Sequence, residues 1–237
     1  MSTPPILRLY LLFATENDRA IILRRSAKKM YNLIAWDRAT DTFTEGQWLK
    51  KSVFAEECRL SPDGQHLIYT VADAYPHTPA TSHYTVLSRA PYFTALALFP
   101  NGSGWQSGGY FLDSTLYRIH GDPVDDIVGR KGDLSQVVKG EGTKDCRSGL
   151  RLLNGQPAPL SRALRDQLLE GAKPPRDTAM DRYETQAGCL YRLEAGERVL
   201  IRDFTEMEPR FEPAPYSTDA EADDQPNWHP LDQERTR

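Results

Sequence analysis

A Ser-Pro-Asp-Gly turn near residue 60 constrains this chain most, because it fixes where one strand ends and the next begins. Pro62 presets its own φ for the second position of a β-turn, and Gly64 readily takes the left-handed conformation that the end of the turn needs. Asp63 can accept hydrogen bonds from nearby backbone amides. The flanking stretches 57–60 and 66–71 have strand character, so the sequence predicts a β-hairpin at this point.

Further short strands are predicted on both sides of this hairpin. Residues 7–14, 20–24, 31–36 and 42–49 are apolar or alternating runs, separated by charged or turn-rich segments. They are rich in β-branched and aromatic residues and lack the 3.6-residue period of a helix. Near the other end, residues 188–204 have the pattern strand, turn, strand. The chain is therefore expected to be mainly β.

The segment Ser-Pro-Asp-Gly-x-x-Leu-Ile-Tyr at 61–69 resembles the repeat of WD40-like (TolB-type) β-propellers, and the hairpin 188–204 is similar to a blade hairpin of the same type. A degenerate second copy of the turn is expected at 98–102, at roughly the 40-residue period of a four-stranded blade. Leu116–Ile119 and Leu190–Leu193 are expected to be equivalent strands. The resemblance implies a β-propeller-like fold or a partial propeller of antiparallel blades. Otherwise the chain resembles uncharacterised bacterial proteins.

The expected organisation is one propeller-like domain over 1–205, followed by a Pro-rich and acidic tail over 206–237. Residues 120–187 interrupt the repeat pattern and are predicted to be an irregular insertion, with a long loop over its first part. Within it, leucines at helical spacing predict one helix near 159–171. The tail is expected to be extended or disordered for most of its length.

Composition favours a soluble protein without a general attraction for polyanions. The net charge is −4 and the isoelectric point is about 5.8, which disfavours nucleic acid or anionic membrane as a partner. No stretch approaches the roughly 20 apolar residues of a membrane span, and the first residues lack the features of a signal peptide. The three widely spaced cysteines favour reduced thiols and a cytoplasmic location.

Two groups of residues are candidates for partner contact. Aromatic residues anchor many protein interfaces, and the candidates here are Trp48, Trp105, Tyr110, Phe111 and Trp228. The alternative for the first four is a place in the core, and for Trp228 it is a frayed terminus. A basic patch is formed by Arg24, Arg25, Lys28 and Lys29, with a solvated hairpin loop as the alternative.

Catalytic motifs are missing from the sequence. The nucleophile elbow, the phosphate-binding loop and the dinucleotide fingerprint are all absent, and no cofactor or metal site is predicted. We therefore expect a non-catalytic protein–protein interaction scaffold or a regulatory subunit of a larger assembly, whose partner is another protein. The alternative is a hydrolase at the mouth of a propeller channel, for which Asp63, His66, Asp113 and His120 would have to converge. A third possibility is a nucleic-acid-associated subunit that binds through Arg24–Lys29.

Overall fold

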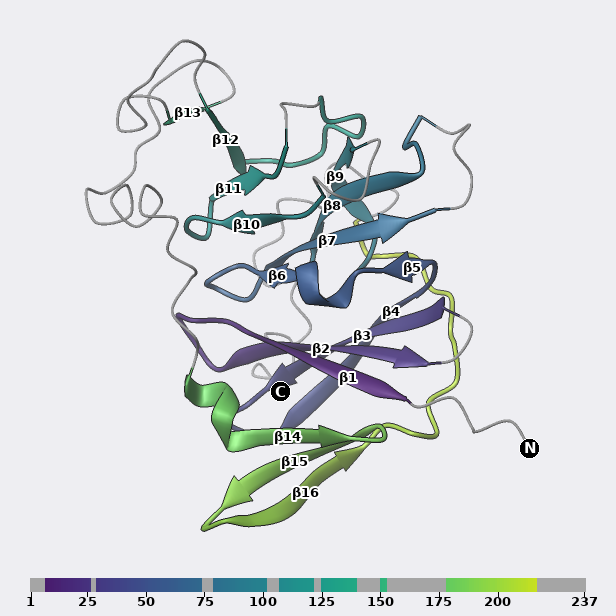
Figure 1. Cartoon of the computed structure of the whole chain (residues 1–237), viewed down its shortest axis with the longest axis vertical. Coiled ribbons are helices and arrows are strands. Elements are labelled where there is room, and N and C mark those ends of the chain that lie inside the picture. The colour runs from purple at the N-terminus through teal and green to yellow at the C-terminus, as the bar shows by residue number, and fades with distance from the viewer. Residues whose placement is uncertain are drawn as a thin grey trace.

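The computed structural model describes residues 7–26, 29–73, 79–101, 107–121, 125–139, 150–152 and 178–216. These residues form a mainly β protein, in which four small and mostly antiparallel sheets lie one above another (Figure 1). The predicted helix 159–171 lies outside the described residues. So do Lys28, Trp105 and Trp228.

The first two sheets contain the strands that the sequence predicted best. Sheet A has the order β1 (Arg8–Phe13), β2 (Arg19–Ser26), β3 (Met30–Asp37) and β4 (Thr42–Lys50). Sheet B has the order β5 (Ser52–Val53), β7 (His66–Ala72), β8 (His83–Arg89) and β9 (Ala95–Pro100), and β6 (Arg59–Leu60) also pairs with β7. A 3₁₀ turn, η2 (Ala55–Glu57), lies between β5 and β6. The hairpin predicted around residue 60 is thus β6–β7.

Sheets C and E come from the second half of the chain. Sheet C has the order β10 (Gly109–Phe111), β11 (Leu116–Ile119), β12 (Ser135–Lys139) and β13 (Leu150–Leu152). Sheet E has three strands, β14 (Tyr183–Gln186), β15 (Cys189–Glu194) and β16 (Glu197–Asp203), preceded by the 3₁₀ turn η4 (Thr178–Arg182). The sequence missed β12, which lies in the predicted loop, and β11 and β12 pair in parallel.

Sheet A is buried on both faces because it lies between two other sheets. Alternate side chains of a strand point to opposite faces. Ile21 and Leu23 therefore pack into a core shared with Leu67 of sheet B. Ile22 and Trp36 pack into a separate core shared with sheet E. This explains why most residues of β2 and all but one of β3 are buried, including the polar Asn32.

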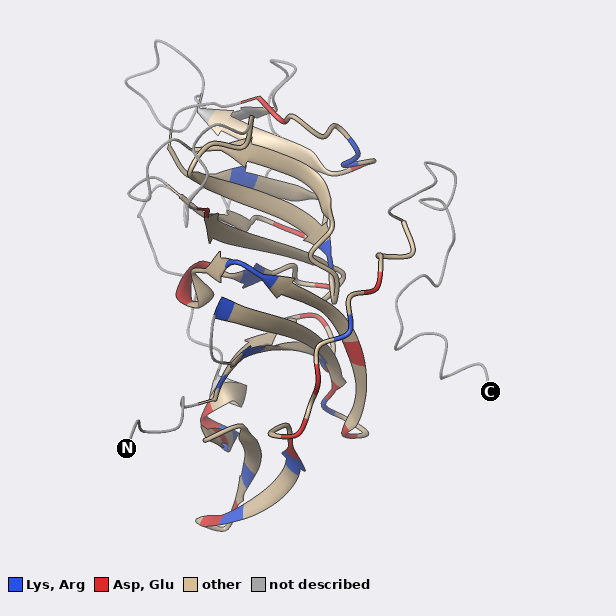
Figure 2. Cartoon of the chain, turned by 90° about the vertical axis from the view of Figure 1, so that its right-hand side faces the viewer, with Lys and Arg blue, Asp and Glu red and all other residues tan. Residues whose placement is uncertain are grey.

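A third core lies between sheets B and C, and the end of the described chain contributes to it. Phe99 of β9 and Tyr117 of β11 pack there with Tyr216. The Tyr216 hydroxyl donates to the Thr94 carbonyl at 2.7 Å and accepts from the Arg89 amide at 3.2 Å. Residues 204–216 form a strap that runs along the side of the sheets (Figure 2). The first residues of the predicted tail are therefore extended, as expected, and are packed on the sheets through Ala214 and Tyr216.

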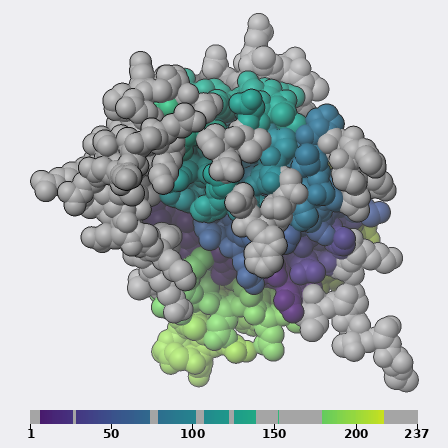
Figure 3. Space-filling model, turned by 45° about the horizontal axis from the view of Figure 1, so that its top comes forward, coloured from purple at the N-terminus to yellow at the C-terminus, as the bar shows by residue number. Residues whose placement is uncertain are grey.

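The edge strands of the four sheets lie on one side of the stack. β1 contacts both β14 and β6, and β6 in turn contacts β10. Sheet E, from the C-terminal part of the chain, therefore lies beside sheet A, from the N-terminal part. The green surface of sheet E adjoins the purple surface of sheet A in Figure 3. Sheets C and E are at opposite ends of the stack in Figure 1.

The turns β1–β2, β6–β7 and β10–β11 of sheets A, B and C have the same construction. A side-chain oxygen of Asn17, Asp63 or Asp113 accepts a hydrogen bond from the backbone amide two residues further on, at 2.9, 3.1 and 2.7 Å respectively. Such Asx turns replace part of the backbone pairing that a turn loses. Gly64 has a φ of +75°, as the Ser-Pro-Asp-Gly signal predicted.

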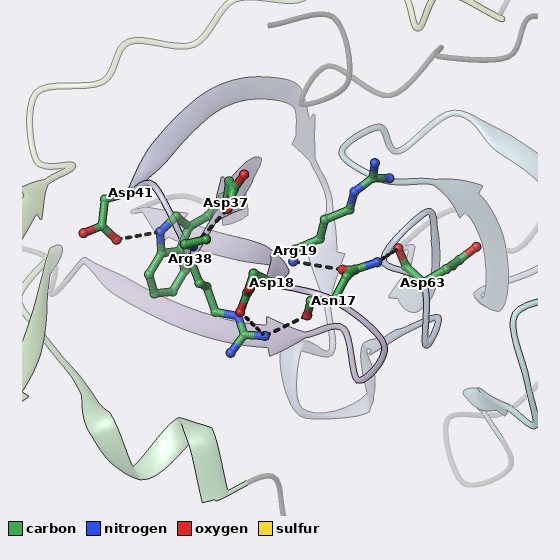
Figure 4. A network of polar contacts seen from close by, with 9 residues as sticks. Asn17, Asp18, Arg19, Asp37, Arg38, Asp41 and Asp63 are labelled. Carbon is green, nitrogen blue, oxygen red and sulfur yellow. Dashed lines mark hydrogen bonds and ion pairs between the residues drawn. The ribbon is translucent and has the colours of Figure 1, made fainter. Parts of the chain in front are cut away.

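Two of these turns are bonded to each other. The Asn17 side-chain amide donates to the Asp63 carbonyl at 2.8 Å (Figure 4). The amides of Thr15 and Glu16 donate to the Pro62 carbonyl. The Arg38 guanidinium adds a bond to the Asn17 carbonyl at 2.9 Å. The turns of sheets A and B are therefore held in a fixed relation at one end of their strands.

The second copy of the turn does not occur where the sequence predicted it. Phe99 and Pro100 belong to β9 and pair with Thr85 and Tyr84 of β8, so this segment continues a strand. The structural equivalent in the next sheet is the turn at Asp113, whose Asp-Ser-Thr sequence lacks both Pro and Gly. Residues 116–119 and 190–193 each lie in the second strand of their sheet, but β11 pairs in parallel with β12, whereas β15 is antiparallel to both of its neighbours.

Candidate functional site

The aromatic candidates fall into two groups. Trp48 is only 4% exposed, and its indole nitrogen donates to the Glu45 carboxylate at 2.6 Å, so it has the core position that was its alternative. Tyr110 and Phe111 on β10 are half-buried. Tyr110 lies against the ring of His120, with a centroid separation of 5.5 Å, and Phe111 packs on the core between sheets B and C. None of these three side chains stands out from the surface.

The predicted basic patch is wrong at Arg24, because this residue is buried. Its side chain is 3% exposed, and its guanidinium donates to the carbonyls of Phe204, Thr205 and Met207 at 2.8, 3.3 and 3.5 Å. Arg24 therefore holds the strap and offers no charge to a partner. Arg25 and Lys29 are exposed, and Lys28 lies outside the described residues. The physical reason is strand alternation, which points neighbouring residues of β2 to opposite faces.

The most exposed apolar side chains on a strand lie on the outer strand of sheet E. Val199 is 43% and Leu200 is 54% exposed, although adjacent strand residues point to opposite faces. Both faces of β16 are thus open at this point. The sheet has three strands where sheets A and C have four, and the β15–β16 hairpin forms one extremity of the molecule in Figure 1. We call this hairpin, residues 189–203, the prong.

The prong is firmly attached to sheet A. Leu190 at its base is fully buried with Trp36, in the core that Phe204 completes just beyond β16. The Arg192 guanidinium pairs with the Asp41 carboxylate at 2.6 Å, and the same carboxylate accepts a bond from the Trp36 indole at 3.2 Å. The exposed part of the prong is therefore carried on a rigid base.

A polar cavity of about 330 Å³ lies where sheet B meets sheet C. Its walls come from the β6–β7 turn, the start of β7, the end of β8, the β10–β11 turn and the loop 130–134. The Arg130 amide donates to the Leu96 carbonyl at 2.8 Å, and the Leu134 amide donates to the Lys131 carbonyl at 3.1 Å. Leu134 itself is buried, so the loop is pinned at both ends.

His66 lines this cavity directly opposite Arg89, its cross-strand partner. Burial lowers the pKa of His66 to about 4, and the positive charge of Arg89 acts in the same direction against the opposing effect of Asp63. The imidazole is therefore neutral at pH 7, with one nitrogen as donor and the other as acceptor.

A second cavity of about 470 Å³ lies against the edge of β1. Leu9, Leu11 and Met180 give it a mainly apolar lining, together with the half-buried Tyr183. Its polar residues include Arg59, whose guanidinium already donates to two carbonyls of its own segment. This cavity is the groove between sheets E, A and B on the side where the edge strands meet.

The hydrolase candidates do not converge. Asp63 and Asp113 use their carboxylates in turns that belong to different sheets. His66 shares the polar cavity with Asp63, but Asp113 and His120 do not line it. The pKa of His120 is lowered by burial and by nearby Arg118 and Arg59. The four residues thus hold separate structural positions.

Metal ligands and membrane-spanning helices were also sought in the part of the chain that the structure describes. It contains no group of three or more His, Cys, Asp or Glu residues placed to hold a metal ion. None of its helices has the length and apolar character to cross a membrane. Cys58 and Cys189 are free thiols.

Comparison with protein-family models, curated proteins and solved structures finds no match to this chain. The class that the structure defines is therefore a mainly β protein of stacked, mostly antiparallel sheets.

Proposed function

We propose that this protein is a non-catalytic protein-binding scaffold with the architecture of a partial β-propeller, and that a partner protein docks on the prong. The observation that carries the proposal is the pair of exposed apolar side chains, Val199 and Leu200, on an outer strand with a rigid base. Exposed apolar surface favours protein contact, and because Val199 and Leu200 point to opposite faces of β16, the partner is expected to contact both faces of this strand. A rigid surface also loses little conformational entropy when it binds.

Two features support the propeller-like part of the proposal. The edge strands lie next to one another along one side of the stack, in the spatial order β14, β1, β6, β10. The inner strands of propeller blades would be arranged in the same way. The Asx turns of sheets A, B and C occupy equivalent positions, as expected for a repeated unit. In a partial propeller the end sheets lack a neighbour on one face, which leaves sheet E accessible.

The partner is expected to contact side chains of the prong, because the backbone edge of β16 is poorly suited to strand addition. The pairing of β15 with β16 has a bulge near Leu200, where the register shifts. Bulges and charged residues on an edge strand disfavour pairing with another chain. Arg198 beside Leu200 is charged and pairs with Glu184 at 2.6 Å.

A charge substitution at the prong tests this function. Leu200→Asp places a carboxylate at an exposed position, so the fold is expected to be retained. Ile127→Asp is the matched control, because Ile127 is 48% exposed and lies on another part of the molecule. The tagged variants are purified from the native host, and the recovered partner is then reconstituted with the purified chain.

The proposal expects one stoichiometric partner that binds the unmodified chain and the Ile127→Asp variant, and whose reconstituted complex is lost with Leu200→Asp. It is refuted if Leu200→Asp still forms the complex, or if the unmodified chain recovers no partner.

A further inference from the structure

The polar cavity between sheets B and C collects positive charge from two elements. Arg89 comes from the end of β8, and Arg130 and Lys131 come from the loop 130–134. Asp63 and Asp133 also line the cavity, so three cations and two carboxylates leave the lining with a formal charge of +1 when His66 is neutral. An arginine can bind two oxygens of a phosphate group at once, and a lysine adds a point charge. This part of the lining suits an oxyanion.

The same cavity also contains groups suited to hydroxyls. Asp63 and Asp133 are hydrogen-bond acceptors, and the side-chain amide of Gln65 can both donate and accept. The hydroxyls of Ser114 and Thr115 donate to the carboxylates of Glu16 and Asp113, so toward a ligand they act as acceptors. Carboxylates beside arginines would oppose a purely anionic ligand, but they match a ligand that carries hydroxyl donors next to its anionic group.

The volume and the walls of the cavity are consistent with a small ligand. About 330 Å³ lies at the lower end of the range for small-molecule sites, which is roughly 300–1,000 Å³. The loop 130–134 is held by backbone hydrogen bonds and by buried Leu134, so the cavity is largely formed before a ligand arrives. Leu96 and Leu134 supply an apolar contribution to the lining.

We propose that this cavity binds a small phosphorylated polyol or sugar, with Arg89, Arg130 and Lys131 around the phosphate and with Asp63, Gln65 and Asp133 toward the hydroxyl groups. The site is separate from the prong and does not depend on the proposed scaffold function. Neutral His66 lies across the strand pair from Arg89 in the wall of the cavity.

The test is calorimetry of the full chain with three probes, namely glucose 6-phosphate, inorganic phosphate and glucose. The proposal expects glucose 6-phosphate to bind about tenfold tighter than inorganic phosphate, with glucose the weakest. The proposal is overturned if the two phosphates bind equally, if glucose binds as well as glucose 6-phosphate, or if glucose 6-phosphate gives no heat at about 10 mM.

Variants and a histidine signal locate the binding. Arg130→Ala and Lys131→Ala should each weaken glucose 6-phosphate by about tenfold, whereas Lys50→Ala, an exposed lysine of sheet A, should leave it unchanged. The His66 imidazole signal, assigned with His66→Asn, should titrate at a higher pH in the complex because an anion favours the charged imidazole. An unchanged His66 titration in the presence of bound ligand, or equal weakening by Lys50→Ala, places the ligand elsewhere and overturns the proposal.

Discussion

Replacement of Arg24 by Met tests whether one buried guanidinium attaches the strap to the body of the protein. Arg24 is one residue from the exposed Arg25 in sequence, yet its three donors face carbonyl oxygens of residues 204–207. Met keeps most of the aliphatic volume and removes every donor. The carbonyl of Phe204 then loses the short 2.8 Å bond in a buried setting, which is the costly part of the change.

The expected loss of stability is about 2–3 kcal/mol. A hydrogen bond to a charged group contributes about 1.5–3 kcal/mol, and the two contacts at 3.3 and 3.5 Å add little because hydrogen bonds weaken at that length. The loss is partly offset because Met avoids the cost of desolvating a guanidinium. The same desolvation lowers the pKa of Arg24 in the folded protein. Against a typical stability of about 5–15 kcal/mol this is a measurable fraction.

Urea unfolding followed by tryptophan fluorescence measures the loss, and hydrogen exchange of residues 204–216 reports the strap directly. Arg25→Met is the matched control, because Arg25 is exposed and lies 5.9 Å from the Tyr31 ring, a contact that contributes at most about 1 kcal/mol. Equal unfolding midpoints for Arg24→Met and Arg25→Met, with unchanged exchange in the strap, would show that the guanidinium does not hold it.

Three further perturbations follow from the turns and from the buried histidine. Gly64→Ala should lower the free energy of unfolding, measured in urea, by about 2 kcal/mol. The φ of residue 64 is +75°, and an added Cβ would lie 2.8 Å from Arg19 Cβ and 3.1 Å from Ala14 Cβ. An unchanged urea midpoint would contradict the turn geometry. Ala195→Asn should raise stability by about 0.5–1 kcal/mol in a thermal melt, since Ala195 has a φ of +51° and Asn tolerates that region better; a lower Tm would argue against it. His66 has its folded pKa at about 4, below the ordinary 6.5, so the unfolded chain binds its proton first. Stability should therefore fall by up to about 3 kcal/mol as the pH drops from 6.5 to 4, and a His66→Asn variant with the same pH slope would refute this.

The strands of sheets A and B were predictable because their local signals agree. Alternating or continuous apolar runs mark β2 and β3, and turn residues mark their ends. The Ser-Pro-Asp-Gly signal placed Gly64 at a positive φ and gave Asp63 its role as a turn residue. These features depend on neighbours within a few residues, which is the range that sequence patterns cover.

Strand β12 was missed because its local signal is weak. It contains two adjacent valines in a segment rich in Gly, Asp and Lys, and it depends on parallel pairing with β11 and on the packing of Val137 against Leu112 and Leu116. Equivalent turns in different sheets were also hard to align, because the Asx turn at Asp113 keeps only the side-chain acceptor of the Ser-Pro-Asp-Gly turn. One oxygen at the right position is enough for the hydrogen bonds, so the rest of the motif is free to vary.

The candidate sites depend on contacts between distant segments, which explains why the sequence did not predict them. Arg24 looked like part of a surface patch because the strap that covers it begins 180 residues further along the chain. The cavity at His66 combines residues from two sheets and a loop. The prong could have been noticed from its apolar run Val199-Leu200-Ile201. Apolar residues on both faces of a strand indicate a strand that is covered on both sides, whereas Val199 and Leu200 are exposed in this chain.

The stack itself separates the roles of its parts. Sheet A is covered on both faces, so its apolar residues fill two cores and leave little surface for a partner. Sheet E lies at one end and shares only one core with a neighbour, which leaves Val199 and Leu200 accessible. The junction between sheets B and C is bordered by a turn and a pinned loop, and polar residues gather there around a cavity. The proposed protein contact at the end of the stack and the proposed small-molecule binding at a junction use separate parts of the molecule, so a substitution at one site should not alter the other.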